Sequence, residues 1–168
     1  MADAAAAAGG IPRCPQPVST GELRGEAASR PPLDIVTGAF SYTGRAIAER
    51  LLSAGRRIRT LSRTPAPPGS GIEAVPFSFE DPARLRHDLA GADVLYNTYW
   101  IRFEHGGATF ERAVENTLVL WRCARDAGIR RVVHVSVTNA SEVSPLPYFR
   151  NKARLERELP RHVSSWAV

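Results

Sequence analysis

Short apolar runs alternate with longer amphipathic segments over most of the 168-residue chain. The apolar runs are rich in β-branched residues and lack a regular polar alternation, which is typical of strands buried on both faces of a sheet. They predict strands at 33–37, 57–61, about 73–77, 93–97 and 131–137, and the start of a sixth strand at 162–168. The amphipathic segments predict helices at about 43–54, 109–127 and 148–159, and a shorter helix after position 81.

Glycine and proline mark the ends of these segments. Gly55 follows the first helical pattern, as glycine commonly does at a helix C-terminus. Asp81 and Pro82 are suited to the N-cap and the first residue of the short helix. Three prolines and two glycines between 64 and 71 predict a loop. We expect Pro160 to end the last helix, because a proline inside a helix removes a hydrogen bond.

The order of these elements predicts an α/β fold. Repeated strand–helix units favour a parallel sheet with helices on both faces. Right-handed crossovers then favour the Rossmann-like, doubly wound strand order 3-2-1-4-5-6. Residues 1–32 are rich in Ala, Gly, Pro and Ser and have few apolar side chains to offset ordering entropy, so we expect a disordered tail there. The folded domain is predicted to be 33–168.

The composition is that of a soluble globular protein, with 43% hydrophobic and 23% charged residues. No apolar run approaches the ~18 residues that a membrane span needs, so we expect no span. The net charge is +5, from 22 basic and 17 acidic residues. The arginines are spread along the chain, and no helix has a continuous basic face interleaved with aromatic residues. We therefore expect no nucleic-acid partner.

Cysteine and histidine usage predicts neither a disulfide framework nor a metal site. The chain has two cysteines and four histidines, scattered without ligand spacing. The alanine-rich start has no basic residue and is a poor secretory signal, so a cytoplasmic location is expected by default. Among the 22 basic residues only Lys152 is a lysine, which makes its position informative.

The most informative motif is a glycine turn between the first predicted strand and helix. Gly38 allows a tight turn, Gly44 allows close packing of the helix, and Ser41 stands where such turns usually have a middle glycine. Backbone N–H groups and the helix dipole would stabilise a pyrophosphate there. The motif predicts a site for NADP or NAD; the alternative is a βα turn without a ligand. The predicted contacts are Gly38, Phe40, Ser41, Tyr42, Thr43 and Gly44.

Two positions bear on how the dinucleotide would bind. If Ser41 needs a positive φ, we expect a strain on the order of 1 kcal/mol, although its hydroxyl is able to donate to a phosphate. After the second strand, NAD sites place an acidic residue, whereas this chain has Ser62 and Arg63. A guanidinium forms a fork on a 2′-phosphate, so Arg63, assisted by Ser62, favours NADP over NAD. The alternative is a solvated arginine.

A tyrosine and the lysine are spaced for one helix face. Tyr148 precedes Lys152 by four residues, and residues four apart share a helix face. A phenol with an ordinary pKa of ~10 is a poor base at neutral pH, and a neighbouring ammonium favours its ionised form. Such a tyrosine exchanges a proton with a carbinol or carbonyl. The alternative is an amphipathic helix start with a packed Tyr148 and a solvated Lys152.

Together these motifs resemble the short-chain dehydrogenase/reductase superfamily. The blocks that carry the likeness are Val36–Gly44, Leu95–Trp100, Val132–Asn139 and Tyr148–Lys152. They are similar to its extended and atypical branches of NAD(P)-binding epimerase/dehydratase-like proteins, including those similar to the nucleotide-binding accessory subunit of respiratory complex I. In that family the sheet is followed by a segment that builds the substrate pocket. This chain stops inside the sixth predicted strand, so we expect a C-terminal truncation that removes that segment.

The resemblance also implies roles for individual residues. Tyr148 resembles the catalytic tyrosine, and Lys152 resembles the lysine that also holds the nicotinamide ribose. The family's Ser/Thr at the end of strand 5 corresponds to Thr138, with Ser136 as second choice. Asn97 and Thr98, after strand 4, and Asn116, in the long helix, would lie near the cofactor.

Three hypotheses follow. The first is the NAD(P)-binding domain of an atypical reductase or epimerase/dehydratase-like enzyme, acting through the Tyr–Lys pair on a small-molecule substrate. The second is a non-catalytic NAD(P)-binding sensor or assembly subunit. The third is a truncated, inactive fragment. The sequence identifies neither the substrate nor an oligomeric state.

Overall fold

The computed structural model of the chain describes residues 30–168, so most of the tail predicted at 1–32 lies outside the described residues. The strands are β1 (Leu33–Thr37), β2 (Arg57–Leu61), β3 (Ile72–Val75), β4 (Val94–Asn97), β5 (Arg131–His134) and β6 (Trp166–Ala167). The helices are α1 (Tyr42–Ser53), α2 (Pro82–Leu89), α3 (Phe110–Asp126) and α4 (Pro147–His162).

The six strands form one parallel sheet in the order β3-β2-β1-β4-β5-β6. This confirms the predicted fold class and strand order. β1 pairs with β2 on one side and β4 on the other, so that Val36 lies between Thr60 and Tyr96. The strand order reverses between β1 and β4, and in such sheets ligands bind beyond the carboxyl ends of the strands near that point.

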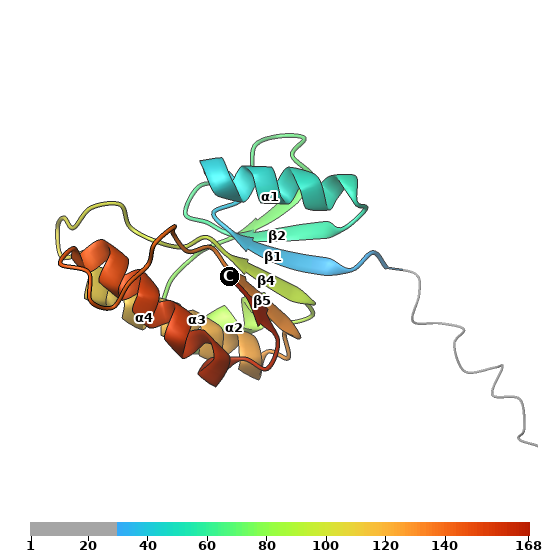
Figure 1. Cartoon of the computed structure of the whole chain (residues 1–168). Coiled ribbons are helices and arrows are strands. Elements are labelled where there is room, and N and C mark those ends of the chain that lie inside the picture. The colour runs from blue at the N-terminus through green and yellow to red at the C-terminus, as the bar shows by residue number, and fades with distance from the viewer. Residues whose placement is uncertain (1–29) are drawn as a thin grey trace, which may run out of the picture. The chain divides into compact units, whose positions relative to one another are not determined.

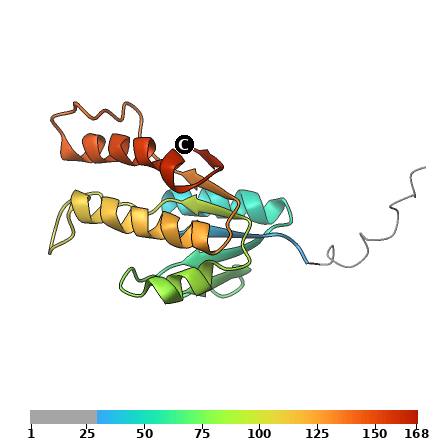
Figure 2. The same ribbon diagram turned by 90° about the horizontal axis from the view of Figure 1, so that it is seen from below.

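Helices cover both faces of the sheet unequally. α1 lies on one face, and α2, α3 and α4 lie on the other (Figure 1). Seen from below, α3 runs between α2 and α4 (Figure 2). The larger core lies on the three-helix side and includes Leu95, Trp121 and Leu155, all fully buried. A smaller core beneath α1 contains Val36 and Ala48. Burial of these apolar side chains is the main favourable term in folding.

Side-chain caps explain where the helices begin. Ser41, Asp81 and Thr109 are the N-caps of α1, α2 and α3, and each accepts a hydrogen bond from a backbone N–H in the first turn. Each cap satisfies one of the N–H groups that have no acceptor within the helix. The predicted cap at Asp81 is therefore confirmed.

The C-terminal end differs from the prediction at two places. α4 does not end before Pro160 but continues to His162, because a proline in the last turn removes only its own hydrogen bond, while Val163 still donates to the carbonyl of Leu159. The prediction that Pro160 ends the helix was wrong. The sixth strand predicted within 162–168 is confirmed, but it spans only Trp166–Ala167, because α4 continues through His162.

β5 is also shorter than predicted, because it ends at His134 rather than at Val137. The carbonyl of the next residue, Val135, accepts a hydrogen bond from the side chain of Lys152. In a longer strand the carbonyl of Val135 would accept from a backbone N–H of a neighbouring strand. Here it accepts from Lys152 instead, and this hydrogen bond connects the end of β5 to α4.

Candidate functional site

The turn between β1 and α1 depends on both of its predicted glycines. Gly38 has a φ of +61°, a conformation that disfavours residues with a Cβ. A Cβ added to Gly44 would lie 2.1 Å from the carbonyl oxygen of Gly38. Gly44 therefore lets the start of α1 approach the turn, and any larger residue there would displace backbone.

Ser41 does not need the left-handed conformation that would have strained it. Its φ is −81° and its ψ is 168°, and its Oγ accepts a hydrogen bond from Gly44 N at 3.3 Å. The first hydrogen bond within the helix runs from Arg45 N to Ser41 O at 2.8 Å. The N–H groups of Tyr42 and Thr43 precede it and therefore have no acceptor within α1. They are backbone donors at a helix N-terminus, where an anion is stabilised.

A pocket of about 300 Å³ opens beside this turn. We call it the lysine pocket, because Lys152 lies at its wall. It brings together residues from the ends of β1, β4 and β5 and from the first half of α4. Seven of the predicted site residues line it, namely Ser41, Tyr42, Thr43, Thr98, Ser136, Tyr148 and Lys152. Trp100 and Arg102 line it as well.

Lys152 is buried, with 3% of its surface exposed. Its Nζ donates to the carbonyl of Val135 at 2.8 Å and lies 4.5 Å from the centroid of the Trp100 ring. Burial lowers the pKa of Lys152 to about 8, an effect that the charge of Glu156 opposes. The interpretation of Lys152 as a solvated lysine is therefore wrong. Near neutral pH a buried ammonium faces the pocket, held by a carbonyl and an aromatic ring.

Tyr148 lies in an aromatic wall of the same pocket. Its ring meets those of Trp100 and Phe110 edge-on, at centroid distances of 6.0 Å and 5.6 Å. These contacts, together with Phe149 at 5.5 Å, restrict how the phenol can turn. Tyr148 is therefore packed and also lines the cavity that Lys152 lines.

The two candidate hydroxyl residues after β5 lie differently. Ser136 lines the lysine pocket, whereas Thr138 is exposed and is not among the lining residues. The hydroxyl of Ser136 donates a hydrogen bond to Oε1 of Glu156 on α4. In this arrangement its hydrogen is not available to a ligand. The roles of Ser136 and Thr138 stay predictions.

Asn97 is buried beneath the pockets instead of lining one. Its Oδ1 accepts from Tyr99 N at 3.0 Å, and its Nδ2 lies 3.1 Å from Nδ1 of His134. Burial, with a smaller contribution from Lys152, lowers the pKa of His134 to about 3. The ring is therefore neutral, and Nδ1 accepts from the amide. Asn97 thus holds the backbone at Tyr99, within a segment whose neighbours Thr98 and Trp100 line the lysine pocket.

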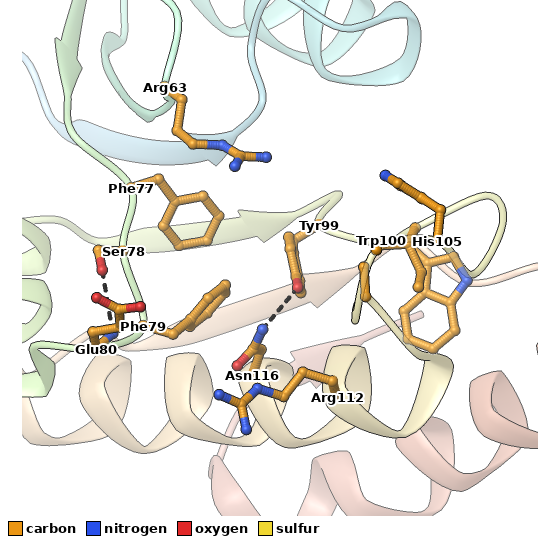
Figure 3. Close-up of a pocket in the computed structure, with 13 residues that line it drawn as sticks. Arg63, Phe77, Ser78, Phe79, Glu80, Tyr99, Trp100, His105, Arg112 and Asn116 are labelled. Carbon is orange, nitrogen blue, oxygen red and sulfur yellow. Dashed lines mark hydrogen bonds between the residues drawn. The ribbon is translucent and has the colours of Figure 1, made fainter.

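A larger cavity of about 660 Å³ lies over the carboxyl ends of β3 and β4 and the start of α3. We call it the aromatic pocket, because Phe77, Phe79 and Tyr99 form its wall (Figure 3). The Phe79 ring lies 4.6 Å from that of Phe77 and 4.9 Å from that of Tyr99. Asn116 of α3 donates to the Tyr99 hydroxyl at 3.0 Å, which fixes the third ring. The predicted Asn116 therefore borders this cavity.

Two arginines from different elements border the aromatic pocket. Arg63 extends from the segment after β2 toward the ring of Phe77, and Arg112 extends from α3 (Figure 3). Arg63 also lines a shallow groove of about 360 Å³ together with Ser62. The structure thus brings Ser62 and Arg63 together beside the aromatic pocket. Of the predicted turn contacts, Gly38, Phe40 and Gly44 line none of these three cavities.

The sequence did not single out several residues that form these cavities. They are Trp100, Glu156, Phe77 and Phe79. Phe77 is the last residue of the predicted third strand, Phe79 follows it by two residues, and Trp100 lies three residues after the predicted fourth strand. Aromatic residues near the carboxyl ends of parallel strands of one sheet are the sequence signal for the aromatic pocket, because those ends meet at one edge of the sheet. Glu156 offers a weaker signal, since it lies four residues after Lys152.

Within residues 30–168, no group of three or more His, Cys, Asp or Glu side chains is arranged to hold a metal ion. In the same part of the chain, no helix has the length and apolarity to cross a membrane.

Comparison with known proteins gives a family match and two curated relatives. Residues 38–165 match the model of a family described as NAD(P)H-binding. Sterol demethylase protein B of Methylococcus capsulatus is 32% identical over 118 residues, which are 66% of this chain and 36% of that protein. A farnesyl dihydroquinoline-oxide ketoreductase of Stigmatella aurantiaca is 33% identical over 107 residues, 60% of this chain and 32% of that protein. The chain therefore spans about a third of the length of these relatives.

Solved structures show the same fold. A short-chain dehydrogenase/reductase superfamily protein of Agrobacterium tumefaciens with bound NAD matches with a TM-score of 0.63 at 27% identity, over 77% of this chain and 44% of that one. The triphenylmethane reductase of a Citrobacter species, complexed with NADP(H), matches with a TM-score of 0.61 at 20% identity, over 78% of this chain and 46% of that one. The second likeness shows the fold alone.

Proposed function

The chain belongs to the NAD(P)H-binding family, and we propose that it is the cofactor-binding part of an NAD(P)-dependent reductase or epimerase/dehydratase-like protein of the short-chain dehydrogenase/reductase superfamily. One observation carries this proposal. The lysine pocket unites the N-terminus of α1 with the side chains of Tyr148 and Lys152. The proposed phosphate-binding turn and the proposed proton-transfer pair therefore line one cavity.

The residues present suit a dinucleotide. The free N–H groups of Tyr42 and Thr43 are donors for the pyrophosphate, and the positive end of the α1 dipole adds to their effect. The lysine pocket lies on one side of this turn and would take the nicotinamide end, which supplies hydride chemistry when bound. The aromatic pocket would take the adenine ring, since flat apolar walls suit a flat base.

The proposed proton transfer uses Tyr148 and Lys152. The phenol of Tyr148 would hold the proton that a substrate carbinol loses or a carbonyl gains. The ammonium of Lys152, one helical turn away on α4, lines the same cavity. The carbonyl of Val135 and the ring of Trp100 hold the ammonium in place at the wall. Proton transfer of this kind typically contributes about 10²- to 10⁴-fold to a rate.

The proposed preference for NADP rests on Arg63. Its side chain is exposed at the border of the aromatic pocket and beside Ser62, where a 2′-phosphate attached to the adenosine ribose would lie. Titration with NADPH and NADH, followed by cofactor fluorescence, tests this. Arg63→Ala should weaken NADPH binding about 10- to 100-fold, as expected for loss of charged hydrogen bonds, and leave NADH binding nearly unchanged.

Arg112→Ala is the matched control, because Arg112 borders the same cavity from α3. It should affect both cofactors equally and weakly. If Arg63→Ala changes NADPH and NADH affinity by the same factor, Arg63 does not read the 2′-phosphate. If the unaltered chain binds neither cofactor, the proposed function is wrong.

A second candidate function is a nucleotide-binding protein without turnover. The observation that favours it is the hydrogen bond from Ser136 to Glu156, which occupies the hydroxyl that the family resemblance gives as the second choice for catalysis, while the first choice, Thr138, does not line the lysine pocket. Tyr148→Phe separates the two candidates. In an enzyme it should abolish cofactor-dependent reduction of a carbonyl panel and spare NADPH binding. A chain that binds NADPH but reduces none of these substrates, with or without the substitution, would support the second candidate.

A further inference from the structure

We propose that Glu156 is a positioning residue of the lysine pocket. Ser136 holds the carboxylate of Glu156 against the end of β5, and from there its negative charge stabilises the buried ammonium of Lys152. The inference deepens the proposed function and rests on it only for the cofactor measurement below. Nothing in the spacing of the Tyr–Lys pair requires a third member. The contacts of α4 supply one.

Geometry places Glu156 on the same face of α4 as Lys152. Tyr148, Lys152 and Glu156 follow one another at intervals of four residues, so their side chains lie along one face of the helix, about 5–6 Å apart at Cβ. That face is turned toward the end of β5, because Lys152 donates to the carbonyl of Val135.

The hydrogen bond from Ser136 fixes where the carboxylate lies. Ser136 follows Val135 directly, so neighbouring residues of the β5 end contact Lys152 and Glu156. An exposed glutamate is free to turn into solvent. This one is half-buried, and its Oε1 accepts the hydroxyl of Ser136. Its negative charge is thereby kept within about one helical turn of the ammonium, without a direct ion pair between the two side chains.

The burial of Lys152 explains why a nearby negative charge is needed. Lys152 is 3% exposed, and a buried ammonium tends to lose its proton. Other charged or titratable groups lie on the elements packed around it. His134 at the end of β5 senses its charge, Arg102 and Tyr148 line the same cavity, and Glu111 on α3 bonds to its neighbour Asn151. His134 is neutral, and Arg102 has the wrong sign. Glu156 is the carboxylate whose charge raises the pKa of Lys152.

Because Lys152 is the single lysine of the chain, its titration is directly measurable. Protein labelled with ¹³C at the lysine Cε gives one lysine resonance, which is followed from pH 6 to pH 11 without cofactor. Glu156→Gln keeps the size of the side chain and removes the charge. It should lower the midpoint of the Lys152 titration by about 0.5 to 2 pH units, as expected for a charge one turn away at an intermediate dielectric.

Glu158→Gln is the matched control, because Glu158 lies on the same helix and pairs with Arg157 and Arg161 instead. It should leave the Lys152 midpoint unchanged. Glu156→Asp retains the charge and should give a midpoint between those of the wild type and Glu156→Gln. Equal midpoints for Glu156→Gln and Glu158→Gln would overturn the inference.

Cofactor affinity, measured over the same pH range, links the charge to binding. NADPH affinity of Glu156→Gln should begin to fall at a lower pH than that of the wild type. If all variants bind NADPH with one pH profile while the Lys152 midpoint does not move, the role of Glu156 is wrong and the proposed function stands. If the midpoint moves but no variant binds NADPH, the charge role stands and the proposed function is wrong.

Discussion

The turn before α1 and the face of α4 contribute to the same pocket by different physical means. The turn acts through backbone: Gly38 adopts a positive φ, Gly44 allows close approach, and the N–H groups of Tyr42 and Thr43 have no acceptor within α1. The α4 face acts through side chains, above all Lys152, whose state depends on residues from β5 and from the segment after β4.

This difference determines how substitutions in each region affect stability and cofactor binding. A backbone site is fixed by folding itself, so a change that disturbs it should cost stability and binding together. A side-chain site holds a buried charge at a cost to stability. A change there should separate the two quantities, with binding lost and stability kept or gained. The predictions that follow test this separation.

The largest effect is expected at Gly44. In Gly44→Ala the new Cβ would lie 2.1 Å from the carbonyl oxygen of Gly38, and the contact is with backbone, which cannot turn away. We expect a loss of about 3 kcal/mol in the free energy of unfolding, typical of severe overpacking, and the loss of measurable NADPH binding. Urea denaturation and cofactor fluorescence measure the two quantities.

Gly55→Ala is the control for this change. Gly55 also has a positive φ, of +74°, but a Cβ there meets nothing within 4 Å. It should cost about 1 kcal/mol for the strained conformation and leave NADPH binding intact. A Gly44→Ala protein that is as stable as Gly55→Ala and binds NADPH would show that the turn tolerates movement, and the comparison with α4 would lose its basis.

The next largest effect concerns Lys152. Here we expect the loss of the buried charge to keep or raise the free energy of unfolding, whereas Gly44→Ala lowers it. The folded protein lowers the pKa of Lys152 from 10.5 to about 8. Between these values the unfolded chain holds a proton that the folded chain has lost, so this residue makes stability rise with pH. The contribution of Lys152 ionisation to the free energy of unfolding is complete above pH 10.5. It is lost as the pH falls to about 8, a change of up to about 3 kcal/mol.

Lys152→Met removes this dependence. Methionine packs on Trp100 without a charge to desolvate, so at pH 7 the variant should be at least as stable as the wild type. Its NADPH affinity should fall about tenfold or more, as expected for loss of a charged hydrogen bond. Arg154→Met, at an exposed position of the same helix, should change neither quantity. A strong loss of stability in Lys152→Met at pH 7 would contradict the description of a costly buried charge.

The contrast between the backbone turn and the side-chain face of α4 also explains which features were predictable from the sequence. Strand order and the roles of Gly38 and Gly44 follow from local signals, because hydrophobic period, turn residues and right-handed crossovers act over short stretches. The same local signals do not predict that α4 continues past Pro160, because the cost of a proline in the last turn is limited to its own hydrogen bond.

The contacts of the side-chain site come from segments distant in sequence. The distances from Lys152 to Trp100 and Val135, and the bond from Ser136 to Glu156, span elements that only the folded sheet brings together. Spacing alone therefore placed Tyr148 and Lys152 on one face but left open whether the lysine was solvated. Asn97 shows the same limit, since its amide lies beneath the pockets, bonded to His134.

The smallest effect is expected at Ser41, where the backbone site depends on one side chain. Ser41→Ala removes the N-cap of α1, and Thr109→Ala removes the corresponding cap of α3, away from the lysine pocket. Each should cost about 1 kcal/mol of stability. Thr109→Ala serves as the control for the stability cost alone. Ser41→Ala should also weaken NADPH binding by a few-fold, because the N–H groups of the turn remain while their positions become less fixed. A loss of 100-fold or more would mean that the Ser41 hydroxyl binds the cofactor directly, and that the turn, too, is partly a side-chain site.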